Sequence, residues 1–178
     1  MKSNFEYRYV TTVLDKLEVE DIGNCAIHIH YESDKLHKDY FLVIKTESGT
    51  TYFKMVNDID LSGVAWTPAF NGASVDFDGN SKTISNLTCN VASGKQSLLG
   101  KFTGKCANLN ITDAKIGNET LGSDICAILA GEANAEISGV HVTGTVNSKL
   151  RRTGGVVGYL TGGSMSDCSA KVSMKSTS

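Results

Sequence analysis

One apolar pattern occurs five times in this chain of 178 residues, and it restricts the fold more than any other feature. Each copy reads apolar-x-x-apolar-x-apolar, and successive copies start 28, 22, 31 and 28 residues apart. Repeats of about 20–50 residues are typical of solenoids, in which each turn of the chain stacks on the turn before it. The copies are Val56/Ile59/Leu61, Ile84/Leu87/Cys89, Cys106/Leu109/Ile111, Ile137/Val140/Val142 and Met165/Cys168/Ala170.

Small residues punctuate the pattern. The chain holds 18 glycines, and a glycine inside a helix costs about 1 kcal/mol relative to alanine, so this density disfavours a helical fold. The residue before each middle apolar position is polar or glycine: Asp58, Asn86, Asn108, Gly139 and Asp167. The sequence therefore predicts an all-β fold, a right-handed parallel β-helix of about five rungs over residues 52–178. The residues expected to point inward are Ile59, Leu61, Leu87, Cys89, Leu109, Ile111, Val140, Val142, Cys168 and Ala170.

Residues 1–51 have a different character and hold three of the four histidines. Alternation at Ile27–Tyr31 and the apolar segment Tyr40–Thr46 predict β-strands, whereas the spacing of apolar residues in Thr12–Glu20 predicts one short helix. A solenoid needs its open end covered, because a bare turn exposes its core and its unpaired backbone. We therefore expect a β-rich N-terminal cap or small subdomain over residues 1–51.

The composition argues against several classes of partner. A net charge of −2 gives no electrostatic reason to bind nucleic acid. No apolar run approaches 18 residues, so we expect no membrane insertion, and Lys2–Glu6 after Met1 contains no apolar signal-peptide region. We expect no metal or other cofactor, because the chain has no Cys-x-x-Cys motif and no zinc-like Cys/His spacing.

The five cysteines are expected to be reduced. Cys89, Cys106 and Cys168 fill apolar positions of the pattern, and Cys126 lies in an apolar run. Reduced cysteine behaves as a small buried hydrophobic residue, and an odd count argues against a complete disulfide framework. Free thiols favour a reducing cytoplasm or an anaerobic exterior.

Several segments resemble GLUG-type repeats, parallel β-helix repeats of bacterial and often gut-bacterial cell-surface proteins. Tyr52–Gly63 is similar to the opening "NDIDLSG" coil, and the other matching segments are Trp66–Pro68, Phe77–Asn80 with Thr83–Leu87, and Gly154–Tyr159 with Met165–Ala170. The resemblance covers residues 52–174. Two departures are Ala69-Phe70, where "IG" is usual, and Ala130–Ala133, which lacks the aromatic residue after glycine.

The resemblance implies a β-helix in a spacer, adhesin stalk or passenger region, and it favours an extracellular or cell-surface location. We accordingly expect a non-enzymatic module that binds a glycan or a host protein, or that serves as a spacer. One alternative is a glycan-cleaving β-helix, as in phage tail spikes, with Asp113, Asp124 and Arg151 as candidate groups. Another is an intracellular interaction protein, which reduced cysteines and the missing signal peptide would fit.

The candidate binding residues lie on two loops, Gly117–Asp124 and Ser148–Thr153. The first belongs to the longest repeat spacing, 31 residues, and the second to the 28-residue spacing after it. Binding sites of solenoids commonly lie on such inserted loops. The second loop holds the tight basic cluster of the repeats, although three charges on one protruding loop are more often a solvated turn. The candidates are Asn118, Asp124, Lys149, Arg151 and Arg152.

Other features have two interpretations. Asp76–Asn80 has oxygen side chains suited to calcium, but its Asp-Gly-Asn sequence is more typical of a turn. His28 and His30 would share one strand face, as metal ligands or as solvent-exposed residues. Trp66 is either a sugar platform or a packing residue. The last rung, near Ala170, is expected to continue into further chain or to pair edge-to-edge with another copy.

Overall fold

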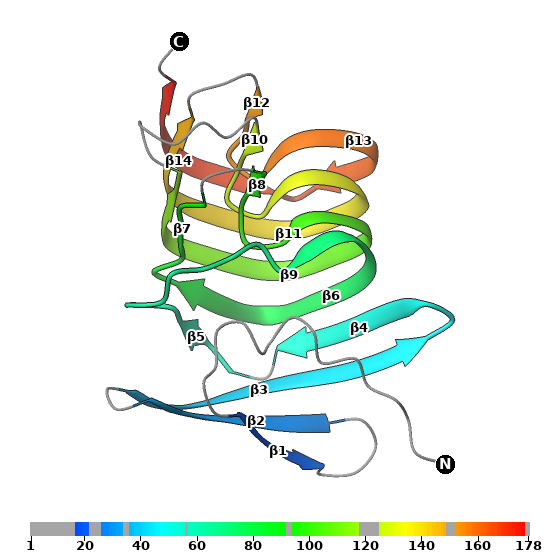
Figure 1. Cartoon of the computed structure of the whole chain (residues 1–178). Helices are drawn as coiled ribbons and strands as arrows, with labels where there is room; N and C mark the ends of the chain where they lie inside the picture. The colour runs from blue at the N-terminus through cyan, green and yellow to red at the C-terminus, as the bar shows by residue number, and fades with distance from the viewer. Residues whose placement is uncertain are drawn as a thin grey trace.

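The computed structural model describes residues 17–21, 26–33, 36–55, 57–91, 94–117, 125–148 and 152–176, with side chains from Ser48 onward. The chain winds into a stack of β-coils, and no helix occurs among the described residues (Figure 1). The prediction of an all-β parallel solenoid is therefore confirmed. Its strands are β4 (Thr50–Met55), β5 (Ile59–Asp60), β6 (Phe70–Ser85), β7 (Thr88–Cys89), β8 (Lys95–Gln96), β9 (Gly100–Ile116), β10 (Ile125–Cys126), β11 (Ala130–Ser148), β12 (Arg152–Thr153), β13 (Val157–Ser166) and β14 (Ser169–Ser176).

The stack makes about four turns. One column of parallel partners passes through Thr51, Val75, Gly104, Ala135 and Gly163. These five strand layers enclose four complete turns, and β14 begins the next one on the edge of β11. The predicted number of about five rungs therefore agrees with the number of strand layers and exceeds the number of complete turns by one. The right-handed sense of the coil stays a prediction.

The register of the repeat was predicted correctly in its second half and wrongly in its first half. Cys106 pairs with Ile137, which pairs with Met165, as the pattern requires. However, Ile84 pairs with Ile111 and not with Cys106. The partner of Cys106 on β6 is Phe77, so the copy that begins at Ile84 aligns with the end of the copy in β9. Strand β6 also places residues 79–81 where β9 has only Asn108.

The polar position of the repeat is a corner of the coil. The φ angles of Asn86, Asn108, Gly139 and Asp167 lie between 50° and 59°, in the left-handed region. Asparagine, aspartate and glycine adopt this conformation at the least cost, which explains the pattern at these four positions. The fifth position, Asp58, is not among the positive-φ residues.

The interior is a continuous apolar column. Phe102, Leu109, Ile111, Leu129 and Val140 are completely buried. Most of the predicted inward residues are buried, whereas Ile59 and Cys168 are half-buried. Ala170 is exposed, contrary to prediction, because it lies on the edge strand β14 with no described strand beyond it.

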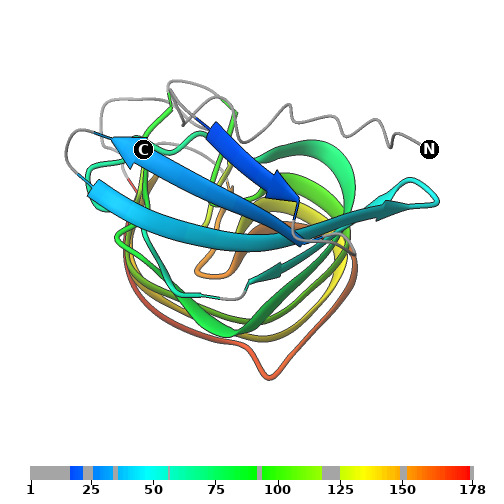
Figure 2. The same ribbon diagram turned by 90° about the horizontal axis from the view of Figure 1, so that it is seen from below.

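Three N-terminal strands extend the sheet beyond β4, each antiparallel to the next: β1 (Leu17–Asp21), β2 (Ala26–Ser33) and β3 (Leu36–Glu47). They lie at the N-terminal end of the coil (Figure 2). The strands expected at Ile27–Tyr31 and Tyr40–Thr46 are confirmed. The helix over Thr12–Glu20 was wrong for its described part, because Leu17–Glu20 pair with β2 and this pairing overrides the local pattern. The covering role of residues 1–51 stays a prediction.

Four cysteines are described, and all are free thiols as predicted. Cys89, Cys106 and Cys126 are buried, whereas Cys168 is half-buried. Burial raises the pKa of the Cys89 thiol from 9.0 to about 11. Burial also raises the pKa of Cys106. The folded chain therefore holds both thiols in their neutral form. Cys25 lies outside the described residues.

Replacing Leu109 tests the register of the core. Leu109 is fully buried in the middle of the stack, so Leu109→Asp places an unpaired charge among apolar residues of two neighbouring turns. We expect a loss of more than about 4 kcal/mol in unfolding free energy, enough to unfold the domain. The matched control is Asn110→Asp, which changes the adjacent, half-buried residue. Equal melting temperatures for the two variants would contradict the register.

The buried Cys89 thiol predicts how stability depends on pH. Its raised pKa means that the unfolded chain ionises first, so stability falls as pH rises from about 9 to about 11. The slope contributed by one such thiol is about 1.4 kcal/mol per pH unit. Denaturant titrations from pH 8 to pH 10.5 should show a shallower loss for Cys89→Ala than for Thr88→Ala. Parallel curves for the two variants would be inconsistent with a buried neutral thiol.

Candidate functional site

Both predicted loops start and end at the same edge of the coil. Ile125 follows the first loop and Arg152 lies near the end of the second, and these two residues are partners in a parallel pair. Gly117, the first residue of the first loop, lies against the backbone of Asn147, which precedes the second loop. Of the candidate residues, the structure describes Arg152, whereas Asn118, Asp124, Lys149 and Arg151 lie outside the described residues. Their convergence stays a prediction.

Five charged or aromatic side chains meet beside these loop ends, and we call them the basic corner. The Nζ atom of Lys101 lies 2.8 Å from Glu132 Oε1, and Lys95 Nζ lies 3.4 Å from Glu132 Oε2. The guanidinium carbon of Arg152 lies 3.7 Å from the centroid of the Tyr159 ring. Glu132 and Tyr159 are register partners, which joins the ion pairs to the cation–π pair.

Two sheets position the basic corner. The short sheet β8–β10–β12 aligns Lys95, Ile125 and Arg152 in one column. The long sheet aligns Lys101, Glu132 and Tyr159 on neighbouring turns. Because neighbouring strands are about 4.8 Å apart, side chains distant in sequence become a compact row.

A buried serine holds the bend between the two sheets. Ser97 is fully buried, and its Oγ accepts hydrogen bonds from the Gly100 amide at 2.8 Å and the Gly131 amide at 3.0 Å. Gly131 is required for close approach, because a Cβ there would lie 2.5 Å from the Cβ of Lys95. The stem of Lys95 therefore crosses directly over the start of β11 and reaches Glu132.

Electrostatics make Glu132 a permanent anion at neutral pH. A hydrogen bond from Lys101 lowers the pKa of Glu132, and the charge of Lys95 lowers it further, whereas partial burial opposes the shift. A general acid of a glycosidase needs the opposite shift. Glu132 thus suits charge pairing and not proton donation.

A second polar feature is the buried side chain that follows Lys95 of the basic corner. Gln96 is fully buried, and neither its amide nitrogen nor its amide oxygen has a hydrogen-bond partner among the described residues. Its Oε1 lies 3.5 Å from the position that a Cβ of Gly117 would occupy, at the base of the first loop. Unpaired buried polar groups are uncommon in folded proteins. The side-chain amide of Gln96 could therefore form hydrogen bonds that no described residue supplies.

Sequence analysis identified Arg152 but missed Lys95, Lys101, Glu132 and Tyr159. A signal was present, because Lys101, Glu132 and Tyr159 each follow a glycine. In GLUG-type repeats an aromatic residue follows the glycine, as Tyr159 follows Gly158. The middle repeat has Glu132 after Gly131 instead. The register shows that the three residues form one row.

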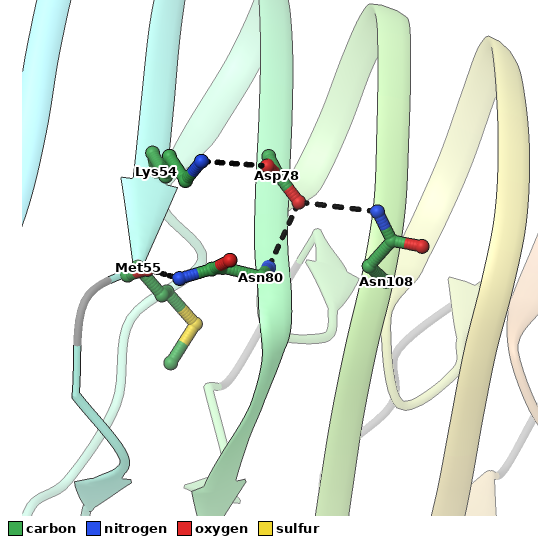
Figure 3. Close-up of polar contacts among 5 residues, drawn as sticks. All are labelled: Lys54, Met55, Asp78, Asn80 and Asn108. Atoms are coloured by element: carbon green, nitrogen blue, oxygen red, sulfur yellow. Dashed lines mark hydrogen bonds and ion pairs between the residues drawn. The ribbon is translucent and has the colours of Figure 1, made fainter.

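The segment Asp76–Asn80 is a structural turn. Asp78 Oδ1 accepts hydrogen bonds from the Asn80 amide at 2.8 Å and from Asn108 Nδ2 at 3.2 Å (Figure 3). Lys54 Nζ lies 3.7 Å from the other carboxylate oxygen, and Asn80 Nδ2 donates to the Met55 carbonyl at 3.0 Å. Asp78 therefore links three successive turns of the coil, as a turn residue should.

The remaining candidates serve structural roles or lie outside the described side chains. Trp66 Nε1 donates to the Leu98 carbonyl at 2.8 Å, and the ring packs on the core, which supports the packing interpretation. The Asp113 amide donates to Thr143 Oγ1 at 3.2 Å, in a left-handed corner. His28 and His30 lie on β2, and their side chains are not described. Among the described residues, no group of three metal-ligating side chains is placed to hold a metal ion.

Comparison with known proteins identifies the last part of the chain. The family model of the GLUG motif matches residues 150–174. The chain carries a GLUG motif. The motif contains Arg152 and Tyr159 and covers β12, β13 and most of β14. The expected resemblance to GLUG repeats is thereby confirmed for this region.

One solved structure is similar, a crystal structure of a "putative immunoglobulin A1 protease" from Bacteroides ovatus. The TM-score is 0.49 with 24% sequence identity, over 71% of this chain and 51% of that chain. The chain therefore spans about half the length of that protein. No curated protein matches the sequence. Within the described residues, no helix has the length and apolar character needed to cross a membrane.

Proposed function

We propose that this β-helix is a non-enzymatic binding module and that its ligand, a glycan, binds at the basic corner. The observation that carries the proposal is the exposed Arg152–Tyr159 pair, which stands on stacked strands beside the ends of both predicted loops. Rigid strands hold the pair, and loops beside such a scaffold commonly complete binding sites. A host protein is the other class of ligand that the family resemblance suggests.

The basic corner is better suited to binding a glycan than to cleaving it. Glycosidases pair a protonated carboxylic acid with a second carboxylate. Glu132 is bonded to two lysines, and its pKa is lowered, so it does not supply the acid. The family resemblance favours a place in a surface-attached or secreted bacterial protein, where the module would serve adhesion or act as a spacer. The free cysteines also fit an intracellular interaction protein.

A matched pair of tyrosine variants tests the proposed site. Tyr159 and Tyr52 are both 39% exposed, but only Tyr159 lies in the basic corner. On a glycan array, we expect Tyr159→Ala to lose most of the binding of the wild-type chain and Tyr52→Ala to keep it. Loss with both variants or with neither would place the site elsewhere. Reducing ends that accumulate over time would show cleavage and would overturn the non-enzymatic assignment.

We also propose that the last turn pairs with a second copy of the chain. Large exposed apolar side chains concentrate there, namely Tyr159, Leu160, Met165 and Met174. A two-fold arrangement that pairs β14 with β14 around Val172 sets Lys171 opposite Ser173 of the second copy. In this register no two lysines face each other, whereas centring on Lys171 or Ser173 would oppose lysines directly, which is destabilising.

Sedimentation analysis tests this pairing. We expect a dimer for the wild-type chain and a monomer for Ser173→Lys, because the new lysine would face Lys171 of the second copy. Thr145→Lys is the control, since Thr145 lies in the same column one turn inward. A wild-type monomer at all accessible concentrations would overturn the proposal, and so would a Ser173→Lys dimer of wild-type strength.

A further inference from the structure

We infer that the basic corner selects acidic glycans, whose sugars carry carboxylate or sulfate groups. This inference rests on the proposed function and names its ligand class. Three cationic side chains, Lys95, Lys101 and Arg152, surround one anionic side chain, Glu132. The local charge is therefore +2, on a chain whose net charge is −2. A positive site on a negative protein favours an anionic ligand at this place.

Arg152 is arranged to receive an anion. Its guanidinium carbon lies over the Tyr159 ring, 3.7 Å from the ring centroid, and the residue is exposed. Among the described residues, no carboxylate forms an ion pair with Arg152. Stacking on the ring orients the planar group and leaves its N–H edges for hydrogen bonds. The paired N–H groups of a guanidinium match the paired oxygens of a carboxylate or sulfate group, a geometry that lysine lacks.

The two lysines extend the positive surface along the stack. Both share the single carboxylate of Glu132, so one of the two charges is not neutralised. Lys101, Glu132 and Tyr159 occupy three neighbouring strands, a row of about 10 Å at the usual strand spacing. Lys101 stands at one end of this row, and Arg152 lies over Tyr159 at the other end. Two cations at this separation suit a polymer with repeated anionic groups better than a single small anion.

The surroundings of Lys101 and Glu132 favour a glycan over an acidic peptide. Extended peptides commonly bind by adding a strand to a free sheet edge. Lys101 and Glu132 lie on β9 and β11, which are paired on both sides, so recognition at these two residues depends on outward side chains, whereas β12 and β13, which carry Arg152 and Tyr159, have a described partner on one side only. An acidic peptide remains the outcome that the test must distinguish.

The test compares probes that differ only in their acidic groups. Oligogalacturonate is compared with its fully methyl-esterified form, and a sulfated galactan with its desulfated form, by calorimetry at 50 mM and 200 mM salt. We expect binding of at least one acidic probe, at least tenfold weaker or no binding of its neutral partner, and weaker binding at the higher salt. The two pairs distinguish carboxylate from sulfate as the recognised group.

Two charge variants give opposite predictions. Arg152→Gln should weaken binding of the acidic probe by about tenfold or more, the usual effect of losing a charged hydrogen bond. Glu132→Gln should strengthen it several-fold by freeing both lysines, whereas a merely structural role for Glu132 predicts weaker binding. Lys115→Gln is the control, because Lys115 is an exposed residue of β9, the strand that carries Lys101, and the change removes one positive charge outside the basic corner.

The outcomes separate the inference from the proposed function. Equal binding of acidic and neutral probes at the corner would overturn the acidic selectivity and leave the glycan-binding function intact. Binding of polyglutamate without binding of any glycan would overturn both and would indicate an acidic peptide ligand. Weaker binding by Glu132→Gln would contradict the charge argument even if Arg152→Gln behaves as expected.

Discussion

Backbone hydrogen bonding between successive turns is the interaction on which this structure depends. A peptide group buried without a partner is costly, so each strand of the coil must match the strands above and below it. The bonds continue through the bends: the Leu98 amide donates to the Ile128 carbonyl at 2.9 Å, and the Ile128 amide donates to the Gly155 carbonyl at 2.9 Å. Once this ladder is fixed, inward residues must be apolar, and the corners must admit left-handed residues.

The same ladder builds the basic corner. Lys101, Glu132 and Tyr159 are about 30 residues apart in sequence, and they become neighbours only because the turns keep register. Ser97 ties the bend to Gly131, and the missing side chain of Gly131 lets Lys95 reach the shared carboxylate. The charged surface is therefore a direct product of stacking, held by elements with little freedom to move.

The parts of the structure visible in the sequence are those that repeat. Apolar positions such as Leu109 and Val140, and the left-handed corners at Asn108 and Gly139, follow from a periodic pattern. The register of β6 escaped prediction because Ile84 fits the apolar pattern, although the partner of Cys106 is Phe77. The basic corner was only partly predictable, since a charge is informative only when its partner on the next turn is known. Tertiary pairing with β2 likewise overruled the local helical pattern at Leu17–Glu20.

Native-state amide hydrogen exchange, measured where the chain is monomeric, tests the central role of the inter-turn ladder most directly. Strands β9 and β11 have partners on both sides, whereas β13 and β14 have a described partner on one side. In a stack whose turns contact only their neighbours, protection should be greatest for amides of β9 and β11 and should fall toward β13 and β14. Equal protection throughout, or stronger protection in β14 than in β9, would contradict the account.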